Sequence, residues 1–245
     1  MGGVGWGGNF PFCYMTRFVA WFFTAASLAI AVGFVFVSLG VVTVPPSYNP
    51  WRPLDVREEP NVLTRYKLAR LERAPAECAA VLRRADVAST PVPDQVTGEG
   101  CGFANAVRVS RAGAEGFVAT CPLAVAFALF DTHVLQPSAQ KHLGQSAARV
   151  LHAGSYACRN INHRVRGRRS EHATANALDV AGFVLSDGTR VSVLQDWNEG
   201  GRRAAFLRDV RAGGCRFFDV VLSPDFNDAH RDHFHFDMGR FRACR

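Results

Sequence analysis

The stretch ALDVAGFVLSDGTRVSVL, residues 177–194, decides the fold class of this chain. Two apolar segments, 177–185 and 190–194, flank the tetrapeptide Ser-Asp-Gly-Thr, which is typical of the turn in a β-hairpin. Strands joined by so short a connection are antiparallel. The stretch therefore predicts an antiparallel sheet in the second half of the chain, with Asp179 on one of its strands.

The rest of the chain supplies helices and further strands. Apolar residues at helical spacing, together with proline and glycine at the expected ends, predict helices at 75–84, 122–133, 137–152 and 199–211. Apolar or alternating runs predict strands at 107–109, 155–158 and 217–222. Because the helices precede most of the strands instead of alternating with them, we expect an α+β domain. Its antiparallel sheet is flanked by helices, in contrast to a doubly wound parallel sheet.

The N-terminal part of the chain is apolar. Residues 18–44 form a run of 27 without a charged side chain, which exceeds the roughly 20 residues needed to cross a bilayer. A cleaved signal peptide is the competing interpretation, although 42–44 makes a poor cleavage site. We therefore expect a short cytoplasmic tail at 1–16, a transmembrane anchor at 17–44, a linker at 45–72 and one domain at 73–245.

The cysteines indicate on which side of the membrane the domain lies. Cys13 precedes the apolar run, whereas the other six cysteines follow it and form no C-x-x-C pair. This pattern argues against a zinc ribbon and predicts up to three disulfides in an oxidising compartment, with the pairing left open. We expect a single-pass inner-membrane protein whose domain lies in the periplasm and whose Cys13 is reduced. Six reduced core cysteines in a cytosolic protein are the alternative.

The chain is basic, with a formal charge of +7 and a pI of about 9.4. Such a charge suits nucleic acid, lipid headgroups or an acidic wall polymer. Nucleic-acid binding usually adds interleaved aromatic residues, so we expect no nucleic-acid partner. A solvated loop is the simplest interpretation of the densest basic run, and attraction to an anionic wall polymer or the membrane surface is the second. The run consists of Arg159, Arg164, Arg166, Arg168 and Arg169.

Histidines and acidic residues near the C-terminus have the spacing of metal ligands. His233 and His235 are two residues apart, so on a strand they share one face while Phe234 faces the core. Asp179 lies in an apolar strand, where its carboxylate needs a cationic partner, and His172 precedes it by seven residues. Two histidines and one carboxylate satisfy a catalytic zinc site. The alternative is that both histidines are ordinary strand residues and that Asp179 pairs with an arginine between 164 and 169.

Two segments carry a resemblance to known proteins. SEHATANALD at 170–179 resembles the S-x-H-x-x-G-x-A-x-D motif of the D-Ala-D-Ala carboxypeptidase and dipeptidase class of zinc peptidases, and DHFH at 232–235 resembles their D/E-x-x-H element. The chain from 78 to 245 is similar to the bacterial extensin-like C-terminal domain, which is related to those peptidases. The resemblance implies a zinc-dependent, peptidase-like fold whose related enzymes cut D-amino-acid peptides of peptidoglycan.

The resemblance also implies a role for individual residues. His172, Asp179 and His235 match the zinc ligands, and Asp232 matches the acidic general base. Tyr156, Arg159 and Ser170 match positions that contact the substrate, and Arg159 also suits stabilisation of an oxyanion. His233 is either a hydrogen-bond donor in the transition state or a residue packed beside the metal. One departure is Ala175, which stands where the peptidase motif has glycine.

The sequence supports two hypotheses about function. The first is a membrane-anchored zinc peptidase that acts on peptidoglycan peptides in the periplasm, through activation of water by the metal and proton removal by a carboxylate. The second is a non-catalytic module of the same fold that binds peptidoglycan or another part of the cell envelope. The four filled ligand and base positions favour the enzyme. The sequence does not define the oligomeric state.

Overall fold

The computed structural model describes residues 12–110 and 116–245, and within its first helix it describes side chains from Arg17 onward. The chain divides into two units, residues 1–49 and 50–245. In the first unit, helix α1 (Phe12–Ser38) contains an apolar stretch, Arg17–Ser38, of mean hydropathy 2.1. By length and composition this stretch suits either a membrane span or a signal sequence. The helix ends at Ser38, six residues before the end of the anchor expected from the sequence.

Part of the expected linker belongs to the second unit, which begins at Pro50. This part contains α2 (Thr64–Arg70) and the 3₁₀ turn η2 (Leu71–Arg73), preceded by a short turn, η1 (Pro46–Tyr48). The structure therefore corrects the interpretation of 45–72 as one continuous linker. Burial of apolar side chains explains the difference, because four of them join the core: Leu54, Val56, Leu68 and Leu71.

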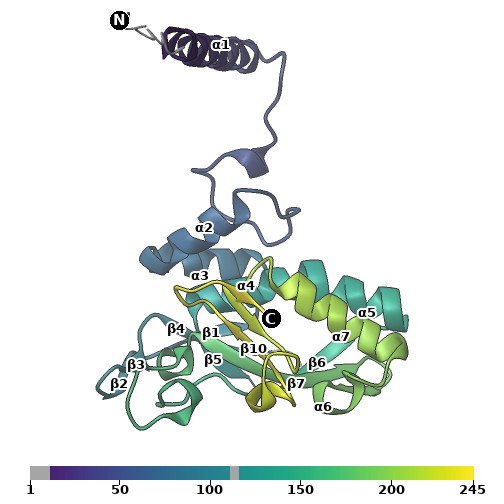
Figure 1. Ribbon diagram of the computed structural model, residues 1–245. Helices are drawn as coiled ribbons and strands as arrows, with labels where there is room; N and C mark the ends of the chain where they lie inside the picture. Colours follow the sequence, from purple (N-terminus) through teal and green to yellow (C-terminus); the bar gives the residue numbers. More distant parts are fainter. Residues whose placement is uncertain (1–11, 111–115) are drawn as a thin grey trace, which may run out of the picture. The chain divides into compact units, whose positions relative to one another are not determined.

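A six-stranded sheet organises the second unit (Figure 1). Its order is β11-β9-β10-β7-β6, and β8 lies off this path and pairs with residues 182–184 of β7. All of its pairings are antiparallel except the one between β9 and β11. The strands are β6 (Ala147–Gly154), β7 (Ala177–Leu185), β8 (Arg190–Ser192), β9 (Val220–Leu222), β10 (Phe234–Asp237) and β11 (Ala243–Cys244).

A smaller sheet and a separate hairpin come earlier in the chain. The three-stranded sheet has the order β1-β4-β5, and β2 and β3 pair only with each other. The sequence pattern predicted β4 at 107–109 but not its partners, so strands are more evenly distributed along the chain than we expected. These strands are β1 (Ser89–Val92), β2 (Gln95–Gly98), β3 (Cys101–Phe103), β4 (Ala106–Val109) and β5 (Phe117–Thr120).

The helices confirm the predictions at 75–84 and in most of 122–133 and 199–211, but the helix predicted at 137–152 extends only to Leu143. Gly144 adopts a left-handed conformation (φ 66°) and ends α5, and residues 147–154 then form β6. The segment 155–158, expected to be a strand, is irregular. The helices are α3 (Pro75–Arg84), α4 (Cys121–Phe130), the π-helical η3 (Asp131–Leu135), α5 (Gln136–Leu143), α6 (Val193–Asp196) and α7 (Gly201–Gly214).

Phenylalanines fill the core between the sheet and the helices that cover one of its faces (Figure 1). Phe130 of α4 lies 5.3 Å from Phe236 of β10, measured between ring centroids, and Phe206 of α7 lies 5.3 Å from Phe183 of β7. Phe234 and Phe236 are fully buried, and the predicted core position of Phe234 is confirmed. The α+β class with a largely antiparallel sheet is therefore confirmed.

Three disulfides connect the six cysteines of the second unit: Cys78–Cys121, Cys101–Cys158 and Cys215–Cys244. The side chain of Cys13 lies outside the described residues. Because disulfides persist in oxidising compartments, these bonds and the N-terminal apolar helix together indicate an extracytoplasmic protein.

Candidate metal centre

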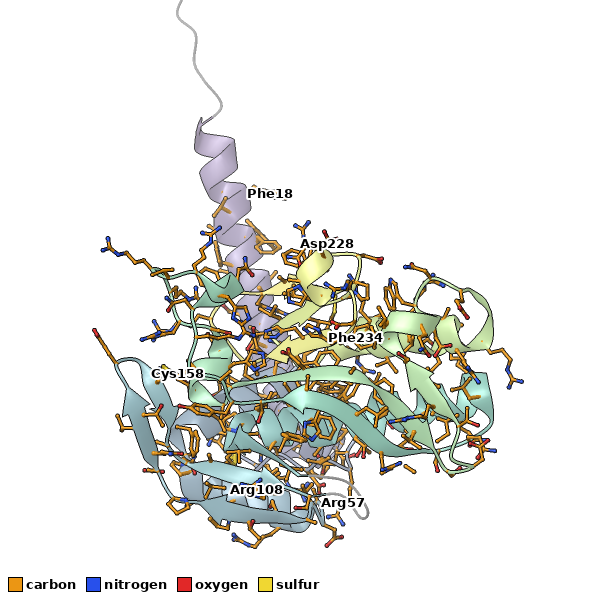
Figure 2. All side chains as sticks on the ribbon, turned by 90° about the horizontal axis from the view of Figure 1, so that it is seen from below. Phe18, Arg57, Arg108, Cys158, Asp228 and Phe234 are labelled. Atoms are coloured by element: carbon orange, nitrogen blue, oxygen red, sulfur yellow. A yellow bond between two sulfur atoms is a disulfide. The ribbon has the colours of Figure 1, made fainter. Side chains whose placement is uncertain are left out.

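The pairing of two strands brings the first two site residues together. In the antiparallel register of β7 and β10, His235 lies directly opposite Asp179. Their side chains meet on the same face, where His235 Nδ1 is 2.9 Å from Asp179 Oδ1. Figure 2 shows Phe234 at the start of β10 beside β7, and Asp228 on the turn that precedes the strand. Asp179 therefore meets a histidine here, and the described structure contains no pairing of its carboxylate with the arginines between 164 and 169.

A short 3₁₀ helix, η5 (Glu171–Thr174), supplies the third residue. Ser170 caps it, because the serine hydroxyl accepts a hydrogen bond from the His172 amide. The turn closes at Ala175, which has φ 53° and ψ 30°. Here alanine occupies the left-handed conformation that glycine adopts without strain, so the departure from the peptidase motif leaves the turn in place.

His172 completes a group of three potential ligand atoms. Its Nε2 lies 3.1 Å from Asp179 Oδ1 and 3.2 Å from His235 Nδ1. The three residues are the group of histidine and acidic side chains that could hold a metal ion among the described residues. His172 is 2% exposed and His235 is 9% exposed, so water screens this group only weakly.

Hydrogen bonds on the outer side of both rings fix how the histidines face the centre. His172 Nδ1–H donates to the backbone carbonyl of Ser155 (3.1 Å), and His235 Nε2–H donates to Asp237 Oδ2 (2.9 Å). Each inner nitrogen then carries a lone pair, because a neutral imidazole protonates one nitrogen at a time. Sequence reasoning missed both partners. Asp237 is two residues from His235 on the same strand face, whereas a backbone carbonyl has no sequence signal.

This arrangement fits a metal ion. Two imidazole lone pairs and a carboxylate oxygen converge within 3.2 Å of one another, and such acceptors repel unless a cation lies between them. Ligand atoms around a tetrahedral zinc at about 2.1 Å are separated by roughly 3.4 Å, which is close to these distances. The outer hydrogen bonds match the usual support of metal-binding histidines by carboxylates and carbonyls.

The surroundings of the centre favour a positive charge on His235 and a negative charge on Asp179. Burial opposes a charge on His235, but hydrogen bonds and the charges of Asp179 and Asp237 raise its pKa to about 9. Burial likewise opposes ionisation of Asp179, yet hydrogen bonds from His172 and His235 lower its pKa well below the usual range. Without a metal, a proton therefore occupies the position between the acceptors.

His233 lies beside the centre, and Asp232 supports it. His233 Nε2 is 3.6 Å from Asp179 Oδ1, and His233 Nδ1–H donates to Asp232 Oδ1 (2.8 Å). Asp232 precedes β10 in a turn, where the alternation of the strand does not apply, and its side chain is 50% exposed. The hydrogen bond from His233 lowers the pKa of Asp232. The carboxylate therefore orients the histidine that faces the centre.

His230, on the 3₁₀ turn η6 (Asp228–His230), is a further histidine at the site; it belongs to the histidine cluster of the sequence but had no predicted role. Its ring centroid is 5.2 Å from that of His233 and 5.9 Å from that of His235. Burial and the charges of His235 and His233 lower the pKa of His230 to about 4, so this ring is neutral at physiological pH. The H-x-x-H-x-H spacing was the signal that could have identified it.

The substrate-contacting residues expected from the resemblance lie on the segment that leads from β6 to η5. The Arg159 carbonyl accepts a hydrogen bond from the Ser170 amide. The positive charge of the Arg159 guanidinium contributes to the lowered pKa of His230. Tyr156 forms a short hydroxyl–hydroxyl hydrogen bond with Thr97 of β2 and packs edge-on against Phe103 of β3. The hydroxyl of Ser170 serves as the cap of η5.

The fold and the site define a class: an extracytoplasmic, disulfide-bonded α+β domain with a buried His-His-Asp cluster on an antiparallel sheet. Residues 76–245 match the family described as the extensin-like protein C-terminus. Since the match covers more than half of the chain, the protein belongs to the extensin-like C-terminal family. No curated protein and no solved structure shows significant similarity to it.

Proposed function

We propose that this protein is a zinc-dependent peptidase that acts on D-amino-acid-containing peptides of peptidoglycan. The observation that carries the proposal is the convergence of three potential ligand atoms from His172, Asp179 and His235. The outer ring nitrogens of both histidines are already hydrogen-bonded. The resemblance of 170–179 and 232–235 to the zinc peptidase motifs supports the reaction class. We propose further that α1 is an uncleaved anchor, so that the domain acts at the periplasmic side of the inner membrane.

His172, Asp179 and His235 would hold the zinc ion. When bound, zinc supplies Lewis acidity, which lowers the pKa of water and polarises a carbonyl group. Three protein ligands also leave a fourth position open, which is typical of catalytic sites. Asp237 and Ser155 keep both imidazoles turned inward, and this reduces the reorganisation that binding requires.

We assign proton transfer to the pair formed by Asp232 and His233. His233 Nε2 is the free ring nitrogen nearest the centre, because its Nδ1 is engaged by Asp232. A carboxylate that accepts a hydrogen bond from one ring nitrogen fixes the tautomer and the orientation of the histidine, as a general acid–base pair requires. This assignment reverses the order expected from the motif, in which Asp232 itself removes the proton.

Arg159 is the residue that we propose to stabilise negative charge on the substrate. A guanidinium can donate two parallel hydrogen bonds to a carboxylate or an oxyanion. The electrostatic influence of Arg159 on His230 supports its proximity to the histidines. Peptidoglycan stem peptides end in a carboxylate, and this chemistry suits such a contact.

The test is product analysis after incubation of the purified, zinc-loaded chain with muropeptides. We expect release of a D-amino acid or a cleaved cross-link, and we expect no product from His235→Ala. The variant His142→Ala, which changes a histidine on α5 outside the site, is the matched control. Tight zinc binding without any product would contradict the peptidase function and favour the non-catalytic, peptidoglycan-binding module.

A further inference from the structure

Residues 159–169 form a strongly basic loop, here called the arginine loop, between β6 and β7. The loop has five arginines and no acidic residue. Arg164 and Arg166 are exposed, and neither guanidinium has a hydrogen-bond or ion-pair partner among the described residues. Val165, between them, is 97% exposed. The tip therefore presents two uncompensated positive charges to solvent.

Several contacts hold this loop in one conformation. Asn160 forms an isolated β-bridge with Arg169, and its side-chain amide donates to the carbonyls of Arg164 (2.9 Å) and Val165 (3.3 Å). The Arg169 guanidinium donates to the Glu99 carbonyl in the β2–β3 hairpin through two nitrogens. The backbone of the tip is thus fixed from both sides, so binding there costs less ordering entropy.

The tip turns through two consecutive left-handed residues. Asn162 has φ 53° and His163 has φ 56°; asparagine adopts this left-handed conformation readily, whereas it costs the histidine about 1 kcal/mol. Hydrogen bonds from Asn160 maintain the turn. A merely solvated loop gains nothing from this strain, whereas a binding loop gains a fixed position for Arg164 and Arg166.

Both ends of the loop are bonded to the metal-binding segment. The Ala157 amide donates to the carbonyl of His172 (3.0 Å), and the Ser170 amide donates to the carbonyl of Arg159 (3.0 Å). The Cys101–Cys158 disulfide attaches the residue before the loop to the β2–β3 hairpin, and Figure 2 shows Cys158 at this junction. The base of the arginine loop is therefore attached to the segment that carries His172 and to the β2–β3 hairpin.

We propose that the arginine loop binds a carboxylate-bearing polymer and delivers segments of it to the site. Arg164 and Arg166 would contact the carboxylates, while Arg168 is already occupied by Glu171 (3.6 Å) and by the ring of Phe241 (4.4 Å). A wall polymer with peptide carboxylates has this chemistry in the compartment indicated by the disulfides. The inference rests on the proposed function for its substrate, but the binding step does not depend on catalysis.

The test compares Arg164→Gln/Arg166→Gln with Arg83→Gln/Arg84→Gln in the full chain. The second pair lies exposed on α3 and changes the net charge by the same amount. With poly-L-glutamate as the probe, we expect affinity to fall roughly threefold to tenfold for the loop variant only, which corresponds to two exposed ion pairs. Added salt should weaken binding of the unchanged protein more than that of the loop variant.

Other probes distinguish the competing ligands. An equal loss in both double variants would overturn the proposal, because net charge alone would then explain binding. A loop-dependent loss seen only with polyphosphate would assign the loop to phosphate groups, and one seen only with anionic phospholipid vesicles would assign it to the membrane. Either result would overturn the carboxylate assignment.

Binding is measured in the His235→Ala background, which we expect to cut nothing. If only the loop double variant loses affinity for poly-L-glutamate in this background, while the parent releases no product from muropeptides, the loop proposal stands and only the proposed function fails. If the parent cuts muropeptides but the loop variants bind poly-L-glutamate as the parent does, only the loop proposal fails.

Discussion

The paired strands β7 and β10 and the loops around them contribute to the site in different ways. Asp179, His235 and Asp237 lie on strands, and their relative positions follow from one antiparallel register. His233 and Asp232 lie just before β10, outside the ladder, and Asp232 is half exposed. The sheet therefore fixes two of the three proposed metal ligands, while the loops supply His172 and the groups to which we assign proton transfer and substrate contact.

The largest effect is expected from loss of a metal ligand. Asp179→Ala, on the strand side, and His172→Ala, on the loop side, should each abolish tight zinc binding, because two remaining ligands do not make a zinc site. Thermal unfolding with and without zinc measures this. A zinc concentration of 100 times Kd stabilises a folded protein by about 2.7 kcal/mol, and both variants should lack that gain. If a variant keeps the full stabilisation by zinc, the substituted residue is not a zinc ligand.

The next effect concerns the proton-transfer pair outside the strands. His233→Ala should lower kcat by about 10² to 10⁴-fold, the usual contribution of a general acid or base, with zinc content unchanged. Asp232→Asn should lower it less, because His233 keeps its position near Asp179 and loses only its orienting partner. Steady-state kinetics on muropeptides, with zinc analysis of each variant, measures both effects. A larger loss of kcat in Asp232→Asn than in His233→Ala would show that Asp232 is the general base.

Zinc affinity should depend on pH through His235 on the strand side. Its pKa is raised to about 9, so below that pH the metal-free site holds a proton that zinc must displace. Affinity should therefore rise about tenfold per pH unit from near neutrality up to about pH 9, and then level off. Competition titrations with a chelator of known affinity across this range measure the slope. A flat profile would show that the site binds zinc without releasing this proton.

A smaller effect is expected from the partner of His235. Asp237→Asn should weaken zinc binding about 10- to 100-fold, the range typical of carboxylates that support a metal-binding histidine. Asp228→Asn, which changes an acidic residue on the nearby 3₁₀ turn η6, should leave affinity unchanged. Equal affinities of the two variants would contradict the orienting role of Asp237.

The smallest effect tests the turn that positions His172. Ala175→Gly relieves the left-handed strain but removes a buried methyl group, so the free energy of unfolding should change by less than about 1 kcal/mol. Ala175→Val should destabilise clearly more, because a β-branched residue is rarely found at positive φ. Denaturant unfolding of both variants measures the difference. Equal stability of the valine and glycine variants would contradict the strained turn.

The sequence predicted the strand half of the site better than the loop half. The turn after β7 carries Asp and Gly, and the alternation of Phe234, His235 and Phe236 follows the strand period, so this half could be derived locally. The end of α5 could not be predicted from the sequence, because residues 147–152 have apolar spacing that suits a helix as well as a strand. Gly144 and pairing with β7 decided between them.

Other parts of the site depend on contacts between distant segments. The Ser155 carbonyl acts on His172 only after the chain has folded back, and the cysteine spacing does not reveal that Cys158 pairs with Cys101. Asp237 was within reach of sequence reasoning, since it follows His235 by two residues on the same strand. Its role required knowing which ring nitrogen faces Asp179.

The most direct measurement is X-ray absorption spectroscopy of the purified chain after dialysis against zinc, combined with a count of zinc per chain. The account predicts one zinc per chain, ligated by nitrogen and oxygen atoms, with the outer-shell scattering of two imidazoles and no sulfur. A chain that binds no zinc, or zinc ligated by cysteine sulfur, would contradict the assignment of His172, Asp179 and His235 as a metal centre.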